Sequence, residues 1–156
     1  ISNIRRCVGD IVPPGPVDSD GDGVYDDDDY CPDTPRGATV DDRGCWVLQG
    51  VEFESNRAEI RPLYEPELEG VATVLEDNPG LRIQIQGHTD NIGSESYNLK
   101  LGYKRAEAAM RYLNMEQGIP LFRMNVISYG EYKPVADNSS ADGRKQNRRV
   151  TLVVME

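Results

Sequence analysis

Aspartates crowd one short stretch near the N-terminus, DSDGDGVYDDDD at residues 18–29, in which seven of twelve residues are aspartate. Counted from Asp18 as position 1, carboxylates fall at positions 1, 3, 5, 9 and 12, and Gly23 falls at position 6. This is the ligand spacing of a calcium loop, where a hard cation takes roughly six to eight oxygens and a glycine allows a sharp turn. The predicted calcium ligands are Asp18, Asp20, Asp22, Asp26, Asp29 and the backbone carbonyl of Val24.

The alternative for this stretch is a solvated acidic linker, which is what runs of like charge often are. A random acidic run has no reason to place a glycine at position 6 and to keep positions 2, 4, 7 and 8 free of acids. A bound cation would also cancel the repulsion among the carboxylates. Proline-rich flanks, VPPGPV before the stretch and YCPDTPRG after it, exclude the helices of an EF-hand.

The three cysteines, Cys7, Cys31 and Cys45, all lie in the N-terminal third of the chain. Cys31 and Cys45 flank a loop rich in proline, glycine and aspartate, which favours a disulfide and an oxidising compartment. A zinc site is the alternative, but the region has no CxxC spacing and the single histidine, His88, is far away in sequence. Cys7 is left over, either free or paired outside this chain.

A second set of residues suited to chemistry lies in GHTDNIGSESYNLKLGYKRAEAAMRYL, residues 87–113. On a helix that opens between residues 94 and 98, Asn98, Leu101 and Arg105 share one stripe. The side chain of Arg105 points back toward the helix N-terminus, where the Asp90 loop must lie. Such a pair suits a zwitterion, because Asp90 takes an ammonium and Arg105 takes a carboxylate. The simpler alternative is that the two only pair with each other, which contributes about 0–1 kcal/mol at a surface.

Hydrophobic periodicity predicts the elements that position these residues. Alternation predicts strands at 47–53 and 81–86. Apolar stripes predict one helix from residue 66 to before residue 78, and a second that opens between residues 94 and 98 and runs to residue 113. Two further strands are expected at 125–129 and 149–154, with a long polar loop at 130–147 between them. The order βαβαββ predicts a two-layer α/β sandwich with helices on one side of a mixed sheet. The predicted division is an N-terminal linker and calcium module, 1–46, followed by an α/β domain, 47–156.

Charge and composition narrow the function classes. The net charge is −10, of which −7 lies in residues 1–46, and no basic patch dominates, which argues against nucleic-acid binding. No apolar run approaches the ~18 residues that span a bilayer, and no signal peptide opens the chain, which begins at Ile1. We therefore expect a piece of a longer protein whose membrane anchor lies outside this sequence.

From Asp18 to Cys45 the pattern DxDxDGxxDxxDxCPDTPxGxxVDxxGC resembles thrombospondin type 3 repeats as they occur in bacterial outer-membrane proteins. The resemblance implies an irregular coil wrapped around calcium and closed by the two cysteines. Additional oxygens are expected from Asp33, Asp41 or Asp42. Trp46, at the junction, is expected to pack between the two parts of the chain.

Residues 47–156, through GHTD, the following RA pair and ISYGEYKPVADNSSADGRKQNRRV, resemble the OmpA-like (OmpA/MotB/Pal) peptidoglycan-binding domain. The calcium coil followed by this domain is the order found in OprF-type porins. The resemblance implies that Asp90 and Arg105 grip the free amino-acid end of diaminopimelate in the peptidoglycan stem peptide. It adds Thr89, Asn98, Leu101 and Asn56 to the binding site, with Phe53 in the same first-strand loop. Gly102 stands where the family usually has serine, a change that lowers helix stability by up to ~1 kcal/mol without removing a ligand contact.

The resemblance implies a non-catalytic tether in the periplasm, which holds an outer-membrane protein to the cell wall through a calcium-stabilised spacer. The alternative is a calcium-dependent adhesion module without wall binding. An enzyme is not expected, because no nucleophile or paired catalytic carboxylates are apparent and His88 has no serine or cysteine partner. His88 is instead expected to orient the Asp90 loop. Arg144, Arg148 and Arg149 could form a cationic cluster, but the resemblance implies that Asn147 and Arg148 brace the loop and the last strand.

Overall fold

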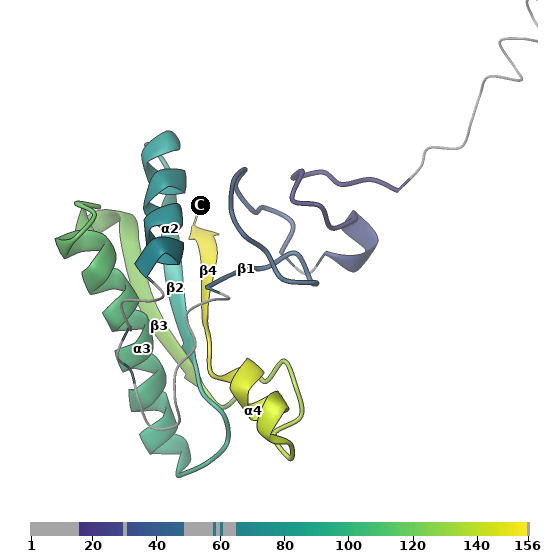
Figure 1. The fold of residues 1–156 in the computed structure, drawn as a ribbon, viewed down its shortest axis with the longest axis vertical. Helices are drawn as coiled ribbons and strands as arrows, with labels where there is room; N and C mark the ends of the chain where they lie inside the picture. The colour runs from purple at the N-terminus through teal and green to yellow at the C-terminus, as the bar shows by residue number, and fades with distance from the viewer. Residues whose placement is uncertain (1–15, 30, 49–57, 59, 61–64, 156) are drawn as a thin grey trace, which may run out of the picture.

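The structure, a computed structural model, describes residues 16–29, 31–48, 58, 60 and 65–155. Four strands form one sheet in the order β1-β4-β2-β3 (Figure 1). Strand β2 (Arg82–His88) runs parallel to β3 (Met124–Gly130), and β4 (Val150–Met155) runs antiparallel both to β2 and to β1 (Trp46–Val47). The predicted mixed sheet is therefore confirmed.

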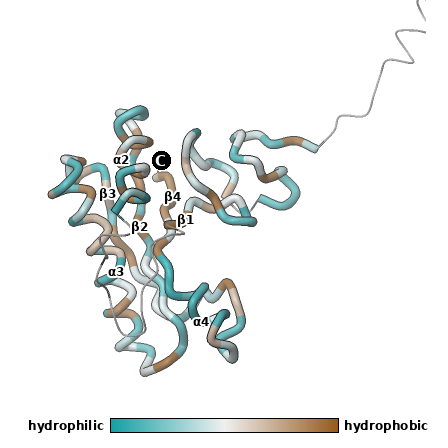
Figure 2. The backbone as a smooth tube through the Cα atoms, in the orientation of Figure 1, coloured by the Kyte–Doolittle hydropathy of each residue, from teal (hydrophilic) through white to brown (hydrophobic). Residues whose placement is uncertain are grey.

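Helices α2 (Glu65–Asp77) and α3 (Glu95–Met115) follow the predicted apolar stripes and pack against the sheet (Figure 1). Leu68 and Leu75 of α2 and Leu113 of α3 are completely buried, as are Ile83 and Ile85 of β2. Apolar positions recur along the strands and helices, with polar positions between them (Figure 2). Burial of these side chains, about 1.5–3 kcal/mol each, is what holds the two layers together.

Two glycines let α3 approach the sheet closely near the Asp90 loop. A Cβ atom on Gly87 of β2 would overlap the carbonyl oxygen of Gly102 on α3, and one on Gly102 would overlap the Ser128 hydroxyl on β3. Gly102 was expected only to loosen the helix. It instead allows α3 to lie directly against β2 and β3 at the end of the sheet that leads into the Asp90 loop.

The described part of the N-terminal coil, residues 16–29 and 31–45, is irregular apart from a short 3-10 turn at Asp26–Asp28 and an isolated bridge at Val40. The predicted disulfide between Cys31 and Cys45 is present. Within the loop that it closes, the buried Thr34 hydroxyl bridges the carbonyls of Cys31 and Gly44, each at 2.9 Å.

Trp46 joins this coil to the sheet. It pairs with Leu152 of β4 and forms a bridge with Val40 of the coil. Only 3% of its surface is exposed, and it belongs to the main hydrophobic core, against which Ala38 of the coil also packs. The expected packing of Trp46 between the two parts of the chain is therefore observed.

The polar segment 130–147 was predicted to be a loop throughout. The structure differs, because the segment ends in helix α4 (Ala141–Asn147). Ser140 caps this helix by accepting a hydrogen bond from the Gly143 amide at 2.9 Å. The Asn147 side chain then accepts from the amides of Val135 and Ala136, at 2.7 and 3.0 Å, and so fixes the preceding loop. The prediction failed because this short helix has no apolar stripe and is stabilised by caps.

Some predictions fall on residues that the structure does not describe. Residues 49–53 of the predicted first strand, Phe53 and Asn56 of its loop, and Cys7 all lie outside the described residues. The division at residue 46 stays a prediction. Within the described ranges, no helix combines the length and apolar character needed to cross a membrane.

Candidate functional site

Asp90 lies in the loop that connects β2 to α3, and the backbone around it is fixed. The preceding residue, Thr89, donates its amide to the Gly130 carbonyl at 2.9 Å and its hydroxyl to the Asp90 carbonyl at 2.8 Å. The Asp90 carboxylate accepts the Ile92 amide at 3.1 Å. Thr89 and Asp90 are both buried. The loop therefore holds the carboxylate in one orientation.

Arg105 is a charged side chain with no exposed surface. It projects from α3, and its Nη1 donates to the His88 carbonyl at 3.0 Å. Burial lowers the pKa of Arg105 to about 10, Asp90 opposes that shift, and the positive charge of Arg148 adds to it. Arg105 is thus fully charged at neutral pH and is influenced electrostatically by both Asp90 and Arg148.

Asn98 and Leu101 lie on the same buried face of α3 as Arg105, as their spacing predicts. The helix begins after Ser94, whose hydroxyl accepts the Tyr97 amide. The Asn98 side-chain amide donates to the Glu131 carboxylate at 3.2 Å, and its oxygen is buried without a partner among the described residues. A buried acceptor without a donor is a place where a ligand hydrogen-bond donor would be favourable.

Arg148 belongs to the site, although it was predicted only to brace the loop and the last strand. Its Nη1 donates to the second oxygen of Asp90 at 3.0 Å, and the two side chains are 16% and 6% exposed. Gly87 of β2 pairs with Val150 of β4, and the His88 amide donates to the Arg149 carbonyl. This register sets residue 148 beside the Asp90 loop, so a prediction of which strands pair could have found it. Glu131, the partner of Asn98, was also missed.

These side chains form a small polar cluster at the ends of β2 and β3, where α3 begins. Asp90, Arg105 and Arg148 together carry one net positive charge. The arrangement can attract a carboxylate to the guanidinium groups and an ammonium to Asp90. The structure brings together the predicted Asp90, Thr89, Asn98, Leu101 and Arg105, whereas Asn56 lies outside the described residues.

The His88 side chain was expected to orient the Asp90 loop, but its contacts lie elsewhere. Its Nε2 lies 3.1 Å from the hydroxyl of Thr151 on β4, and its ring stacks on Tyr129 at 5.6 Å. Only its backbone carbonyl serves the site, through Arg105.

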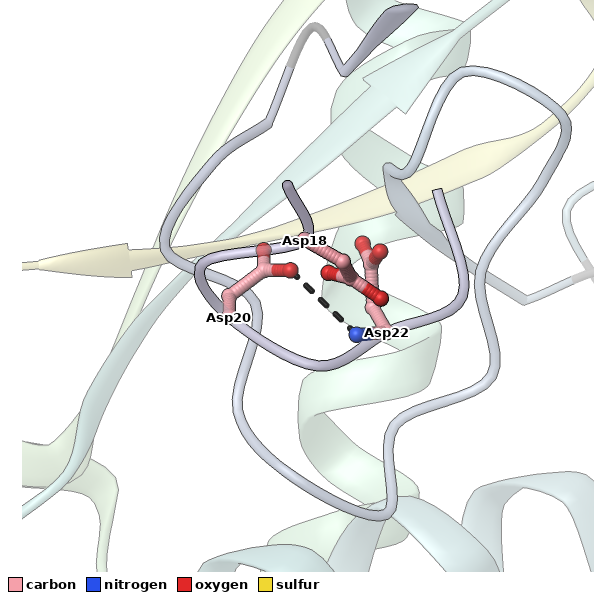
Figure 3. Close-up of side chains that lie close together, drawn as sticks. All are labelled: Asp18, Asp20 and Asp22. Carbon is pink, nitrogen blue, oxygen red and sulfur yellow. Dashed lines mark hydrogen bonds between the residues drawn. The ribbon is translucent and has the colours of Figure 1, made fainter. Parts of the chain in front are cut away.

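The predicted calcium ligands gather within the coil. The carboxylates of Asp18, Asp20 and Asp22 turn toward one another (Figure 3), with one oxygen of each within 4.8 Å of the others. Asp29 joins them, because a Cβ atom on Gly44 would meet carboxylate atoms of both Asp29 and Asp22. One oxygen of Asp22 and one of Asp29 are buried without a partner among the described residues.

The electrostatics of this cluster suit a cation. The pKa of Asp22 is raised by burial and by the neighbouring carboxylates of Asp20 and Asp18. The pKa of Asp29 is raised by burial and by the carboxylates of Asp22 and Asp20. A backbone hydrogen bond opposes each of these shifts. Buried, unpartnered oxygens that repel one another are a good fit to a divalent ion.

The two remaining predicted ligands are engaged differently. The Asp26 carboxylate accepts both the amide and the hydroxyl of Ser19, at 2.8 and 2.5 Å. The Val24 amide donates to Asp22 at 2.8 Å, which shapes the turn. The role of the Val24 carbonyl as a calcium ligand stays a prediction. The four carboxylates of Asp18, Asp20, Asp22 and Asp29 therefore form the better-supported part of the ligand set.

The chain is similar to several outer-membrane proteins and lipoproteins. The chain is 39% identical over 144 residues to outer membrane porin F of Pseudomonas aeruginosa. The matched region covers 88% of this chain and 41% of porin F. It thus spans less than half the length of that relative.

Solved structures also share the fold, and two of them show it well. The peptidoglycan-associated lipoprotein of Burkholderia pseudomallei has a TM-score of 0.64 at 38% identity, covering 67% of this chain and 88% of its own. The cell wall anchor of the type VI secretion system of Pseudomonas aeruginosa has a TM-score of 0.58 at 32% identity, covering 69% and 78%. The sequence profile of the OmpA family matches residues 52–148, which include every residue of the Asp90 cluster. The chain belongs to the OmpA family.

Proposed function

We propose that this chain binds peptidoglycan without catalysis and anchors a longer protein to the cell wall. The names of its structural relatives, a peptidoglycan-associated lipoprotein and a cell wall anchor, support this function. The observation that carries the proposal is the buried cluster of one carboxylate and two guanidinium groups, with Asp90 and Arg148 paired at 3.0 Å.

The ligand group that fits this cluster is the free amino-acid end of diaminopimelate. Its ammonium replaces Arg148 as the partner of Asp90, and its carboxylate binds the guanidinium groups of Arg105 and Arg148. The Asn98 side-chain oxygen, which no donor of the described residues contacts, accepts a further hydrogen bond from the ammonium. Burial makes these contacts specific, because a group that leaves one of the charges unpaired is penalised.

Retention on purified peptidoglycan tests the proposal. Asp90→Asn removes the charge while keeping the shape, and Arg105→Lys removes the two-pronged donor while keeping the charge. Each should weaken retention by about tenfold or more, as the loss of a charge-assisted hydrogen bond implies. The matched controls are Asp77→Asn, at the exposed end of α2, and Arg111→Lys, whose side chain is 68% exposed on α3.

The chemistry of the wall provides a second arm. Peptidoglycan with lysine in place of diaminopimelate lacks the carboxylate that the guanidinium groups would bind, so wild-type protein should be retained poorly on it. If both site variants keep wild-type melting temperatures and wild-type retention, the site is wrong. Equal retention on the two kinds of wall contradicts the diaminopimelate assignment.

We also propose that the coil binds calcium through Asp18, Asp20, Asp22 and Asp29 and serves as a spacer between the wall-binding domain and the membrane. Support comes from the unpartnered oxygens of Asp22 and Asp29 and from the mutual repulsion of the cluster. By analogy with porin F, we place the chain in the periplasm, as part of an outer-membrane protein.

A further inference from the structure

A second polar site lies between the coil and the sheet. Two adjoining pockets of about 250 and 330 Å³ share the lining residues Cys31, Gln86, Lys133, Leu152 and Val153. Side chains alternate along a strand, so Gln84, Gln86 and His88 face away from the buried Ile83 and Ile85 of the helix layer. The cleft therefore occupies the side of β2 and β4 that the helices do not cover.

One end of this cleft is positively charged. Arg43 from the coil, Lys133 from the loop after β3 and Arg149 before β4 all line the smaller pocket, and none of its described lining residues is acidic. Arg43 has a carboxylate partner just outside, Asp41 at 3.0 Å. The Lys133 ammonium lies over the Tyr129 ring at 3.9 Å. Three cations and one carboxylate leave an excess of two positive charges.

Arg149 is only 8% exposed, so its charge is largely out of water. Its two terminal nitrogens donate to the carbonyls of Asn147, at 3.3 Å, and Lys133, at 2.9 Å. Its Nε is buried with no partner among the described residues. Burial and the nearby Arg43 lower the pKa of Arg149 to about 10, against the influence of Asp41. A buried cation with a spare donor is stabilised by a bound anion.

His88 adds an acceptor to these donors. The Thr151 hydroxyl donates to the Gln86 side-chain oxygen at 3.1 Å, so the proton in the 3.1 Å contact between Thr151 and His88 comes from Nε2. The other ring nitrogen, Nδ1, is then a bare acceptor, and it is buried without a partner among the described residues. The imidazole is 2% exposed and lines the same pocket.

Donors with excess positive charge beside one buried acceptor match an anion that still carries a proton. We propose that this cleft binds a phosphate group, with Arg43, Lys133 and Arg149 on its oxygens and His88 Nδ1 accepting its remaining hydroxyl. The adjoining pocket is lined mainly by apolar side chains such as Pro32, Pro35 and Trp46, with Asp33 and Thr34 also in its lining. It takes an uncharged, largely apolar substituent of a phosphate monoester. The site is separate from the Asp90 cluster, and Asp90 is not among its lining residues.

Isothermal titration calorimetry and NMR of the arginine Nε–H and histidine ring signals test this on the full chain at pH 7. Calcium is kept at the protein concentration so that calcium phosphate does not precipitate. Inorganic phosphate should bind with one site per chain and shift the signals of Arg149 and His88. Sulfate has the same shape but no proton to donate, so it should bind about tenfold more weakly. Phenyl phosphate also reaches the adjoining pocket, but a phosphate monoester keeps a proton only below about pH 6. It should therefore bind more tightly than inorganic phosphate in a titration at about pH 5.5.

Variants at the partly exposed cations avoid disturbing the fold. Lys133→Gln and Arg43→Gln should each weaken phosphate about fivefold, whereas Lys100→Gln, an exposed lysine on α3, should have no effect. Asp90→Asn should leave phosphate binding intact, so failure of wall binding and failure of this site are distinguishable. Sulfate binding as tight as phosphate, no saturable shift at Arg149, or equal affinities of the Lys133 and Lys100 variants would each overturn the assignment.

Discussion

Arg148 and Asp90 are 58 positions apart in the chain, yet their side chains meet at 3.0 Å. At the residue scale this contact shows what spacing alone can and cannot predict. Asp90 and Arg105 follow from local structure, because a loop and the helix after it must lie together. Arg148 follows only from the register of β4 against β2, which no pattern within one element contains.

His88 makes folding stability depend on pH. Burial, with the positive charges of Arg149, Lys133 and Arg43, lowers the pKa of His88 from 6.5 to about 3. The folded state therefore disfavours the protonated ring. Its contribution to stability is fully present above pH 6.5 and is lost as the pH falls toward 3, at about 1.4 kcal/mol per pH unit. Between pH 7 and 4.5 the free energy of unfolding should fall by about 3 kcal/mol from this residue.

Urea unfolding at several pH values measures this effect. His88→Gln has no ionisable ring, so its stability should change less over the same range, while the carboxylates contribute equally to both proteins. The comparison concerns slopes and is unaffected by any constant loss of stability in the variant. Parallel slopes for the two proteins would show that His88 is not held neutral by its surroundings.

At the scale of elements, the glycine contact between β2 and α3 sets the distance between the two layers. Gly87→Ala places a methyl group on the Gly102 carbonyl, and backbone cannot move aside as a flexible side chain can. We expect a loss of about 3 kcal/mol or more in the free energy of unfolding. In contrast, Gly70→Ala in α2 meets no atom within 4 Å and should stabilise the protein by about 0.5–1 kcal/mol.

Thermal and urea denaturation of the two variants provide a matched comparison, because both replace glycine with alanine. If Gly87→Ala is as stable as wild type, the close contact is not required by the fold. A destabilising effect of Gly70→Ala would mean that α2 is under a constraint other than helix propensity.

The elements that could be predicted are those held by apolar side chains. The stripe of Leu68, Val71, Ala72 and Leu75 gives α2, and the alternation of Ile83 and Ile85 gives β2. Elements that are stabilised mainly by polar contacts cannot be predicted from hydrophobic periodicity. Helix α4 depends on its Ser140 cap, and Arg123 fastens the end of α2 by donating to the carbonyls of Leu75 and Asn78, each at 2.7 Å.

At the scale of the whole molecule, calcium should control the stability of the coil. Calcium at about 100 times its dissociation constant should raise the free energy of unfolding by about 2.7 kcal/mol, because it binds only the folded coil. Asp22→Asn should abolish this response and, since it removes mutual repulsion, should make the calcium-free protein more stable than wild type. Asp27→Asn, an exposed neighbour, should respond to calcium as wild type does.

Calorimetric titration and melting curves with and without calcium measure both effects. Calcium binding that persists in Asp22→Asn would move the site elsewhere on the chain. Loss of calcium binding in Asp27→Asn would mean that net charge, rather than the gathered carboxylates, holds the ion.

The disulfide has a mechanical consequence. Cys31 and Cys45 are 14 positions apart in sequence, but their Cα atoms are 4.9 Å apart. A fully stretched segment of that many residues would reach roughly 46 to 50 Å, so the covalent link withholds roughly 40 Å of contour length from any pulling force. In the tether proposed above, this bond shortens the longest gap that residues 31–45 could bridge. Reduction should therefore let residues 31–45 extend further under load.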